Sequence, residues 1–313
     1  MQVSIVPVIL ILGGGSLAQD RPVVNVVVSA ADFRLGIADE SLATVFGFGL
    51  SDREYVANSV PLPRKLGETE LRFCSQSTTA WEQCSPMELV YAGPRQINFR
   101  VVLSGAPSFP LTGLFVVRRN GVTNEPRLGT TIERALPRIF EMGFDCGYNP
   151  NWRDPTPCGL RAQRVHEMNS VRGAVTDQDG KLVTSLNPAR VGRYYTLWLT
   201  GLGRITNGRL DSDLQMRLAG IPVYGFPGDT WMWVTPSFVG YSPQFPGLYQ
   251  INFQVGRSLM GVGTGPLDYP PLHPCGEYQL DLAINLGLAG RRPEANIVEL
   301  PILIQDGDVA CRR

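Results

Sequence analysis

The sequence predicts an all-β protein made of two tandem β-sandwich domains stapled by disulfides. Glycine and proline supply 34 and 25 of the 313 residues, which disfavours long helices and favours short strands with tight turns. Several segments alternate apolar with small or polar residues at a period of two, as half-buried strands do. Two of them recur later in the chain, which indicates a repeated unit. With 43% hydrophobic residues, the chain does not have the composition of a disordered protein.

The repeat rests on two pairs of similar segments. Ser41–Leu50 and Tyr194–Leu202 share the alternating pattern and end in Gly-Leu, and Gly93–Val101 shares the letters QINF with Gly247–Val255. Residues 49 and 201 are 152 apart, and residues 96 and 250 are 154 apart. Because two separate matches have nearly the same offset, we infer two copies of one β-domain.

Further strands are expected in the first copy. Glu70–Phe73 and Met87–Tyr91 flank a cysteine-bounded loop and predict a hairpin. A second hairpin is expected where Leu114–Arg118 turns at Asn120-Gly121 and returns through Leu128–Ile132.

In the second copy, Leu214–Leu218 and Val223–Phe226 predict a hairpin with a short connection. Gln279–Leu286 and Asn296–Gln305 are expected to close the domain. We therefore predict a signal peptide over residues 1–18, sandwiches over 19–135 and 194–313, and between them a linker, 136–193, that contains a disulfide and a hairpin.

The beginning of the chain has the features of a secretory signal. Val3–Leu12 is an apolar run of suitable length, and Ser16-Leu17-Ala18 offers the small residues that precede cleavage, although no Lys or Arg comes before the run. The run is shorter than the ~20 residues that a membrane-spanning helix needs. We expect cleavage after Ala18 and a secreted or cell-surface protein with no membrane span, and a buried strand or short core helix is the alternative.

Six cysteines agree with export to an oxidising compartment. None has the spacing of a zinc or redox motif, so no metal is expected. Each sequential pair brackets a loop-like or strand-linking segment, and we predict the bridges accordingly, while six free thiols in a cytosolic protein remain the alternative. The predicted bridges are Cys74–Cys84, Cys146–Cys158 and Cys275–Cys311.

These segments, in their order, resemble a known family. The likeness covers Ser29–Val255 and is strongest in the two QINF strands, the strands that end in Gly-Leu, and the turn Asp177–Gly180 followed by Asn187-Pro188. The chain is similar to the repeated, uncharacterised C-terminal domain of large secreted acidobacterial (Solibacter-type) proteins. The resemblance implies paired immunoglobulin-like or IPT/TIG-like sandwiches outside the cytoplasm, without an assigned activity. This chain departs from the pattern in its enlarged loop between Cys74 and Cys84.

The chemistry-bearing residues do not predict an enzyme or a cofactor. Basic and acidic residues balance at 28 each, so the charge that nucleic-acid binding requires is missing. His166 and His273 belong to no zinc motif, and the chain has no nucleophile elbow. Asp177 and Asp179 do not continue into an EF-hand loop. A solvated hairpin turn is the preferred interpretation there, with an exposed Ca²⁺ site as the alternative.

Aromatic residues and one valine-rich strand are the candidates for contact. Trp231 and Trp233 share one face of a strand, and packing in the core or over the sheet is the alternative for them. Trp152 lies inside the second cysteine loop, whereas Trp198 is expected in the core. An uncharged strand near the mature N-terminus is a candidate for donation to a neighbouring subunit, with pairing inside its own sandwich as the alternative. Its candidate residues are Val23, Val24, Val26, Val27 and Val28.

Together these observations predict a secreted, non-catalytic structural or adhesive protein that acts through surface contacts. Strand addition would let it assemble into an extracellular polymer. The alternative is a carbohydrate-binding module that uses exposed Trp and Tyr side chains. The expected partners are further copies of the chain, another extracellular protein or a glycan.

Overall fold

The fold is known from a computed structural model, which describes residues 21–75, 80–103, 108–124, 129–142, 172–184, 186–210, 213–219, 231–255, 276–287 and 298–304. Within these ranges the chain forms strands and one short 3-10 turn, η1 (Trp81–Gln83), and no α-helix. The all-β class is thereby confirmed. The described segments contain no helix with the length and apolar character needed to cross a bilayer.

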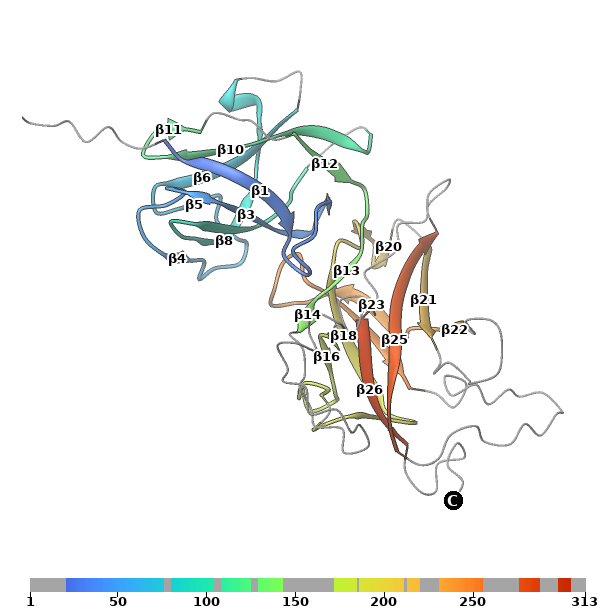
Figure 1. The fold of residues 1–313 in the computed structure, drawn as a ribbon. Coiled ribbons are helices and arrows are strands. Elements are labelled where there is room, and N and C mark those ends of the chain that lie inside the picture. Colours follow the sequence, from blue (N-terminus) through green and yellow to red (C-terminus); the bar gives the residue numbers. More distant parts are fainter. Residues whose placement is uncertain are drawn as a thin grey trace, which may run out of the picture.

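Residues 23–133 form two sheets (Figure 1). Sheet A has the order β1-β3-β9-β8-β4, and sheet B has the order β2-β12-β10-β6-β5, with β7 beside β6 and β11 beside β10. The strands are β1 (Val23–Ser29), β2 (Ile37–Ala38), β3 (Leu42–Phe48), β4 (Tyr55–Val56), β5 (Lys65–Leu66), β6 (Thr69–Ser75), β7 (Ser85–Pro86), β8 (Glu88–Ala92), β9 (Gln96–Arg100), β10 (Leu111–Arg119), β11 (Val122–Thr123) and β12 (Gly129–Glu133).

The described residues between 138 and 304 form two further large sheets and a two-stranded ribbon, β19-β20. Sheet C has the order β13-β18-β24-β23 with β16 beside β18, and sheet D has the order β14-β15-β26-β25-β21-β22 with β17 beside β26. The strands are β13 (Arg138–Ile139), β14 (Glu141–Met142), β15 (Arg172–Gly173), β16 (Val175–Thr176), β17 (Ala189–Arg190), β18 (Tyr194–Thr200), β19 (Ile205–Thr206), β20 (Arg209–Leu210), β21 (Asp213–Ala219), β22 (Trp231–Val234), β23 (Phe238–Tyr241), β24 (Tyr249–Gln254), β25 (Gly276–Gly287) and β26 (Val298–Ile304).

The same sheet topology occurs twice. In sheet A the strands β1-β3-β9-β8 lie side by side, in the order A-B-E-D of an immunoglobulin-like sandwich. In sheet C the strands β13-β18-β24-β23 repeat this order, with the short β13 in the place of β1. Sheets B and D likewise share the orders β12-β10-β6 and β26-β25-β21. The short strand β2 runs parallel to β12, and the short strands β15 and β17 run parallel to β26. The immunoglobulin-like arrangement therefore follows from the observed strand order.

The repeat extends to the register of the matched strands. Thr44 pairs with Asn98 between β3 and β9, and Thr196 pairs with Asn252 between β18 and β24. Each threonine hydroxyl donates to the side-chain oxygen of its asparagine, at 3.1 Å in the first pair and 3.0 Å in the second. Both QINF segments thus occupy the same position next to the strand that ends in Gly-Leu.

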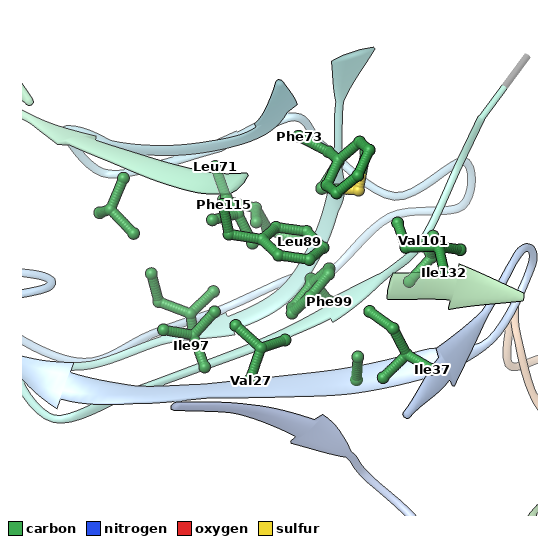
Figure 2. Packing of buried hydrophobic residues seen from close by; sticks show 14 of the residues in the cluster. Val27, Ile37, Leu71, Phe73, Leu89, Ile97, Phe99, Val101, Phe115 and Ile132 are labelled. Carbon is green, nitrogen blue, oxygen red and sulfur yellow. The ribbon is translucent and has the colours of Figure 1, made fainter. Parts of the chain in front are cut away.

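An apolar core fills the space between sheets A and B (Figure 2). Phe115 from sheet B lies with its ring centroid 5.1 Å from that of Phe73 and 5.2 Å from that of Phe99, so the rings join the two sheets in tilted and edge-on contacts. Val27 from the first strand and Ile97 from β9 are buried in the same cluster. Burial of each such side chain contributes about 1.5–3 kcal/mol to folding.

Hydrogen bonds connect the two pairs of sheets directly. The backbone N–H of Leu42 donates to the hydroxyl of Thr200 at 2.7 Å, and that hydroxyl donates to the carbonyl of Gly247 at 2.7 Å. The N–H of Leu136 donates to the carbonyl of Gly201 at 2.8 Å. The ion pairs Asp39–Arg204 and Asp32–Arg138 also connect the two pairs of sheets. We call these hydrogen bonds and ion pairs together the joint.

The first predicted hairpin needs a correction. The loop between Cys74 and Cys84 does return to β6, but only β7 pairs there, with Phe73 opposite Ser85. The strand β8 then crosses to sheet A, where it pairs with β9 and β4. The reason lies in burial, because Met87 and Leu89 are fully buried and extend into the core between the sheets.

Most of the other predicted strands are confirmed, and one predicted pairing partner lies outside the described residues. β10 turns at Asn120 (φ 49°) and Gly121 (φ 79°), which suits a tight hairpin, and β12 pairs with β10 as predicted. β25 and β26 are the expected late strands and pair with each other. The hairpin partner of β21 is β22, whereas the predicted partner at residues 223–226 lies outside the described residues.

The segment predicted as a linker, 136–193, contributes strands to the C-terminal sheets. β13 and β16 pair with β18 in sheet C, and β15 and β17 pair with β26 in sheet D. The hairpin turn expected at Asp177–Gly180 is confirmed, since the N–H of Asp177 donates to the carbonyl of Lys181 at 2.9 Å and Gly180 has a φ of 75°.

Candidate functional site

The outer face of sheet C carries an aromatic side chain where a polar one would be expected. Leu197 and Leu199 are fully buried in β18, so the alternation of the strand places Trp198 on the opposite face. There Trp198 is half-buried, and its indole N–H donates to the hydroxyl of Thr176 at 3.0 Å. This hydrogen bond fixes the indole on the solvent side of the sheet.

An open pocket of about 540 Å³ lies around Trp198. We call it the aromatic pocket, and among the residues that the structure describes, none of its lining side chains is ionisable. The lining residues are Thr176, Trp198, Ser242, Pro243, Gln244, Phe245, Leu248 and Gln250.

The loop between β23 and β24 forms one wall of this pocket. It is closed by two backbone hydrogen bonds, from Ser242 N–H to the Leu248 carbonyl at 2.8 Å and from Leu248 N–H to the Phe245 carbonyl at 3.0 Å. Gly247 has a φ of 84°, a left-handed conformation that glycine adopts readily. The closed loop holds Phe245 with 60% of its surface exposed, next to the half-buried tryptophan.

Gln250 supplies the polar side of the pocket. It pairs with Trp198 across β18 and β24 and is half-buried. At the matched position in the first copy, Gln96 donates its amide to Asn98 at 2.7 Å. Gln250 makes no such side-chain hydrogen bond to any residue in the described ranges. Its amide therefore remains available to a bound molecule.

A second, smaller pocket of about 210 Å³ is lined by Asp177, the residue that follows Thr176 in the chain. It also contains Arg193 and Tyr194. The carboxylate of Asp177 accepts hydrogen bonds from the N–H groups of Asp179 (3.0 Å) and Lys181 (2.9 Å) and from the Asn187 amide (3.1 Å). Asp177 thus stabilises the hairpin turn through these hydrogen bonds.

Burial by itself would raise the pKa of Asp177, but the hydrogen bonds from Asn187 and from the two backbone N–H groups outweigh it and lower that pKa. The carboxylate is ionised and satisfied by its own turn. No group of three or more His, Cys, Asp or Glu side chains gathers within the ranges that the structure describes.

The matched face of sheet A is also aromatic. Phe46 lies 152 positions before Trp198, which is the offset of the repeat. Its ring is 6.0 Å from that of Phe33, which is 61% exposed. Phe48, two residues further along β3, is 53% exposed, and the guanidinium of Arg95 lies 5.7 Å from its ring centroid. Here the rings form an open patch, with a cation beside it.

Two of the sequence-predicted contact residues lie on a strand of sheet D. Trp231 and Trp233 lie in β22, where their backbones pair with Ala219 and Arg217 of β21. Trp152 lies outside the described residues. The prediction that Trp198 belongs to the core was wrong, since it faces outward and lines the aromatic pocket.

The valine-rich segment is engaged in its own chain. β1 pairs antiparallel with β3 from Val23 opposite Phe48 to Ser29 opposite Ala43, with a bulge between Val24 and Val26. Val27 and Val28 are buried. In this structure the segment is the edge strand of sheet A, which is the alternative to donation, and donation would remove Val27 from the core.

Of the predicted bridges, Cys74–Cys84 is present and links β6 to the residue before β7. The remaining cysteines lie outside the described residues, as do both histidines. These residues are Cys146, Cys158, Cys275, Cys311, His166 and His273.

Comparison with known proteins gives only distant likenesses. No family model matches the chain, and no curated protein does. Among solved structures, the FN1–FN3 domains of chicken CNTN1 are 8% identical with a TM-score of 0.21, over 87% of this chain and 63% of that one. The chain thus spans about 63% of the length of that protein fragment.

Two further likenesses are of the same kind. A chimeric titin Z1Z2 that carries an exogenous decorin peptide is 9% identical, with a TM-score of 0.19, over 91% of this chain and 96% of that one. The C-terminal domain of the AgI/II polypeptide BspA from Streptococcus agalactiae is 8% identical, with a TM-score of 0.18, over 86% and 95%. At these scores none of the likenesses bears on function.

Proposed function

We propose that the protein is a secreted, non-catalytic structural or adhesive protein that makes its contact through the outer face of sheet C. One observation carries this proposal, namely that Trp198 and Phe245 line an open pocket on the solvent side of a sheet. Burying apolar surface against a partner is favourable, and exposed apolar patches rimmed by polar groups are typical of interaction sites. The fixed indole and the closed loop make this pocket a preformed one.

The disulfide supports a location outside the cytoplasm. Bridges such as Cys74–Cys84 persist in oxidising compartments and are rare where glutathione keeps thiols reduced. Mass spectrometry of protein collected from the culture medium after thiol alkylation tests the location. We expect Cys74 and Cys84 to remain unalkylated until a reductant is added, and an intracellular protein alkylated at both thiols would contradict it.

Adhesion of protein-coated fluorescent microspheres to the producing cells tests the contact surface. We expect Trp198→Ala to reduce the number of attached microspheres, because it removes the ring at the centre of the pocket. Phe46→Ala is the matched control, since it removes the ring at the same position of the first copy. Equal attachment of wild type and Trp198→Ala, with both proteins folded by circular dichroism, would contradict the proposal.

A further inference from the structure

We propose that the aromatic pocket binds a neutral sugar unit of an extracellular polysaccharide, with the sugar ring stacked on Trp198. This inference rests on the proposed contact function and names the chemical class of the partner. It follows from three properties of the residues described in the lining of the pocket, which are their aromatic rings, their polar groups and their lack of charge.

The aromatic rings of Trp198 and Phe245 offer a surface on which the flat, apolar face of a sugar can pack. A pyranose ring presents C–H bonds on its face, and these pack against the negative face of an aromatic ring. The Trp198 indole is already held by its 3.0 Å hydrogen bond to Thr176, and the Phe245 loop is closed by its backbone bonds. Neither has to be ordered on binding, so little side-chain entropy is lost.

The polar groups offer partners for hydroxyls. Gln244, Gln250 and Ser242 line the pocket beside the rings. An amide carries two donors and an acceptor, and a hydroxyl is both, so together they satisfy neighbouring sugar hydroxyls that also donate and accept. At the matched position in the first copy, Gln96 donates its amide to Asn98, whereas the Gln250 amide has no such partner among the described residues.

The described lining, uncharged and partly polar, disfavours both charged and purely apolar partners. A charged ligand would lose hydration there without gaining an opposite charge. An apolar peptide side chain would cover the amide of Gln250 and leave it unpaired, which is costly. A pocket of about 540 Å³ falls within the range of small-molecule sites, and it is open, as a site for one unit of a long chain must be.

Affinity electrophoresis in native gels tests this inference. The gels contain soluble β-glucan, xylan or galactomannan as neutral probes, and alginate as a charged one. We expect at least one neutral polysaccharide to retard the wild-type protein, and alginate to leave its mobility unchanged apart from the effect of gel charge. Trp198→Ala should weaken the retardation at least about tenfold, and Trp198→Tyr, which keeps a ring, should restore part of it.

Gln250→Ala is a second variant that changes an outward side chain, and it should weaken binding by about threefold to tenfold. Phe46→Ala should bind like the wild type. Thermal unfolding of every variant separates loss of binding from loss of fold. If no neutral polysaccharide retards the wild type, or if Trp198→Ala and Gln250→Ala bind as well as the wild type, the inference is overturned.

The two proposals fail in different ways. If microsphere adhesion depends on Trp198 but no polysaccharide binds, the proposed contact surface is supported and the proposed sugar ligand is contradicted. Retardation by alginate alone likewise overturns a neutral ligand. Loss of both the Trp198-dependent adhesion and the polysaccharide binding overturns the contact surface itself.

Discussion

At the scale of single residues, Trp81 is held by two arginines. The guanidinium of Arg72 lies 4.6 Å from its ring centroid and that of Arg118 lies 4.2 Å from it, so each makes a cation–π contact. Arg72 also donates to the Trp81 carbonyl at 2.9 Å, and Arg118 donates to Glu70 at 2.8 Å. Together with the disulfide, these contacts fasten the cysteine loop to sheet B.

We predict that Trp81→Ala lowers the free energy of unfolding by about 1–3 kcal/mol, because both cation–π contacts and the packing on the disulfide are lost. Trp81→Phe should lose less, since Phe keeps a ring between the two guanidinium groups. Urea unfolding followed by circular dichroism measures the difference. A Trp81→Ala protein as stable as the wild type would show that the arginines do not hold the loop.

The sequence contained enough information to predict the orientation of Trp198 correctly, although our prediction was wrong, but not enough to predict that of Trp81. Leu197 and Leu199 alternate with Trp198, so a strand that buries both leucines must turn the tryptophan outward. The hydrophobicity of tryptophan misled the prediction. The partners of Trp81 come from β6 and β10, and no local pattern relates them to a residue in the cysteine loop.

At the scale of elements, each of the matched strands β3 and β18 is followed directly by a glycine with positive φ. Gly49 has a φ of 60° and Gly201 a φ of 78°. A Cβ at Gly49 would meet only the side chain of Arg119, at 3.2 Å. A Cβ at Gly201 would collide with the backbone oxygen of Leu136, which belongs to the joint.

We therefore expect Gly201→Ala to destabilise the protein more than Gly49→Ala. Both substitutions place alanine in the left-handed region, at about 1–2 kcal/mol each. Gly201→Ala adds a steric clash with a backbone that has little room to move, at about 1–3 kcal/mol. Parallel urea titrations compare the two variants, and equal losses of stability would contradict the tight packing at Leu136.

The existence of the repeated strands and their equivalent positions in two copies followed from the sequence, whereas their pairing with each other comes from the structure. The period of two in Leu42–Phe48 and Tyr194–Thr200 predicted both strands, and the common offset predicted that each lies in the same setting. The sheet that β8 joins was not predictable, because Met87–Tyr91 has the same apolar pattern whether it returns to β6 or crosses to β9. Only the tertiary core distinguishes these pairings.

At the scale of the whole molecule, buried carboxylates lie in the joint. Asp39 is 3% exposed, accepts a hydrogen bond from the Leu103 N–H at 3.0 Å, and lies 3.2 Å from the guanidinium of Arg204. Glu40 is 7% exposed and pairs with Arg100. A second link joins Asp32 to Arg138, at 3.3 Å.

Burial raises the pKa of Asp39, although the Leu103 N–H and Arg204 oppose that shift. Burial likewise raises the pKa of Glu40, against the opposing charge of Arg100. The folded protein therefore binds protons at these sites that the unfolded chain has already released. The free energy of unfolding should fall as the pH rises from the ordinary carboxyl range, near pH 4, through the raised pKa values.

Asp39→Asn isolates this effect. Asparagine keeps an acceptor for the Leu103 N–H and does not titrate. We predict that the stability of the wild type relative to Asp39→Asn decreases as the pH rises from about 4 to about 7. Urea midpoints at several pH values measure the difference, in which most other titrating groups cancel. A difference that grows with pH would mean that the ion pair with Arg204 outweighs burial.

The joint was not predictable from one sequence. Leu42 and Thr200 are 158 positions apart, and Asp39 and Arg204 are 165 apart. Nothing in the local pattern of either segment indicates such a partner. The expectation of a separate linker over 136–193 came from its glycine, asparagine and proline residues, which are also compatible with the short edge strands that the structure has there.

Hydrogen–deuterium exchange of the protein, with and without a cell-surface fraction from the producing organism, tests the proposed contact surface most directly. We predict slower exchange on binding at β16, β18, the loop 242–248 and the start of β24, which surround Trp198, and unchanged exchange in β1 and β22. Slower exchange confined to β1 or β22, with β18 and the loop unchanged, would contradict the account and place the contact on the valine strand or on Trp231 and Trp233.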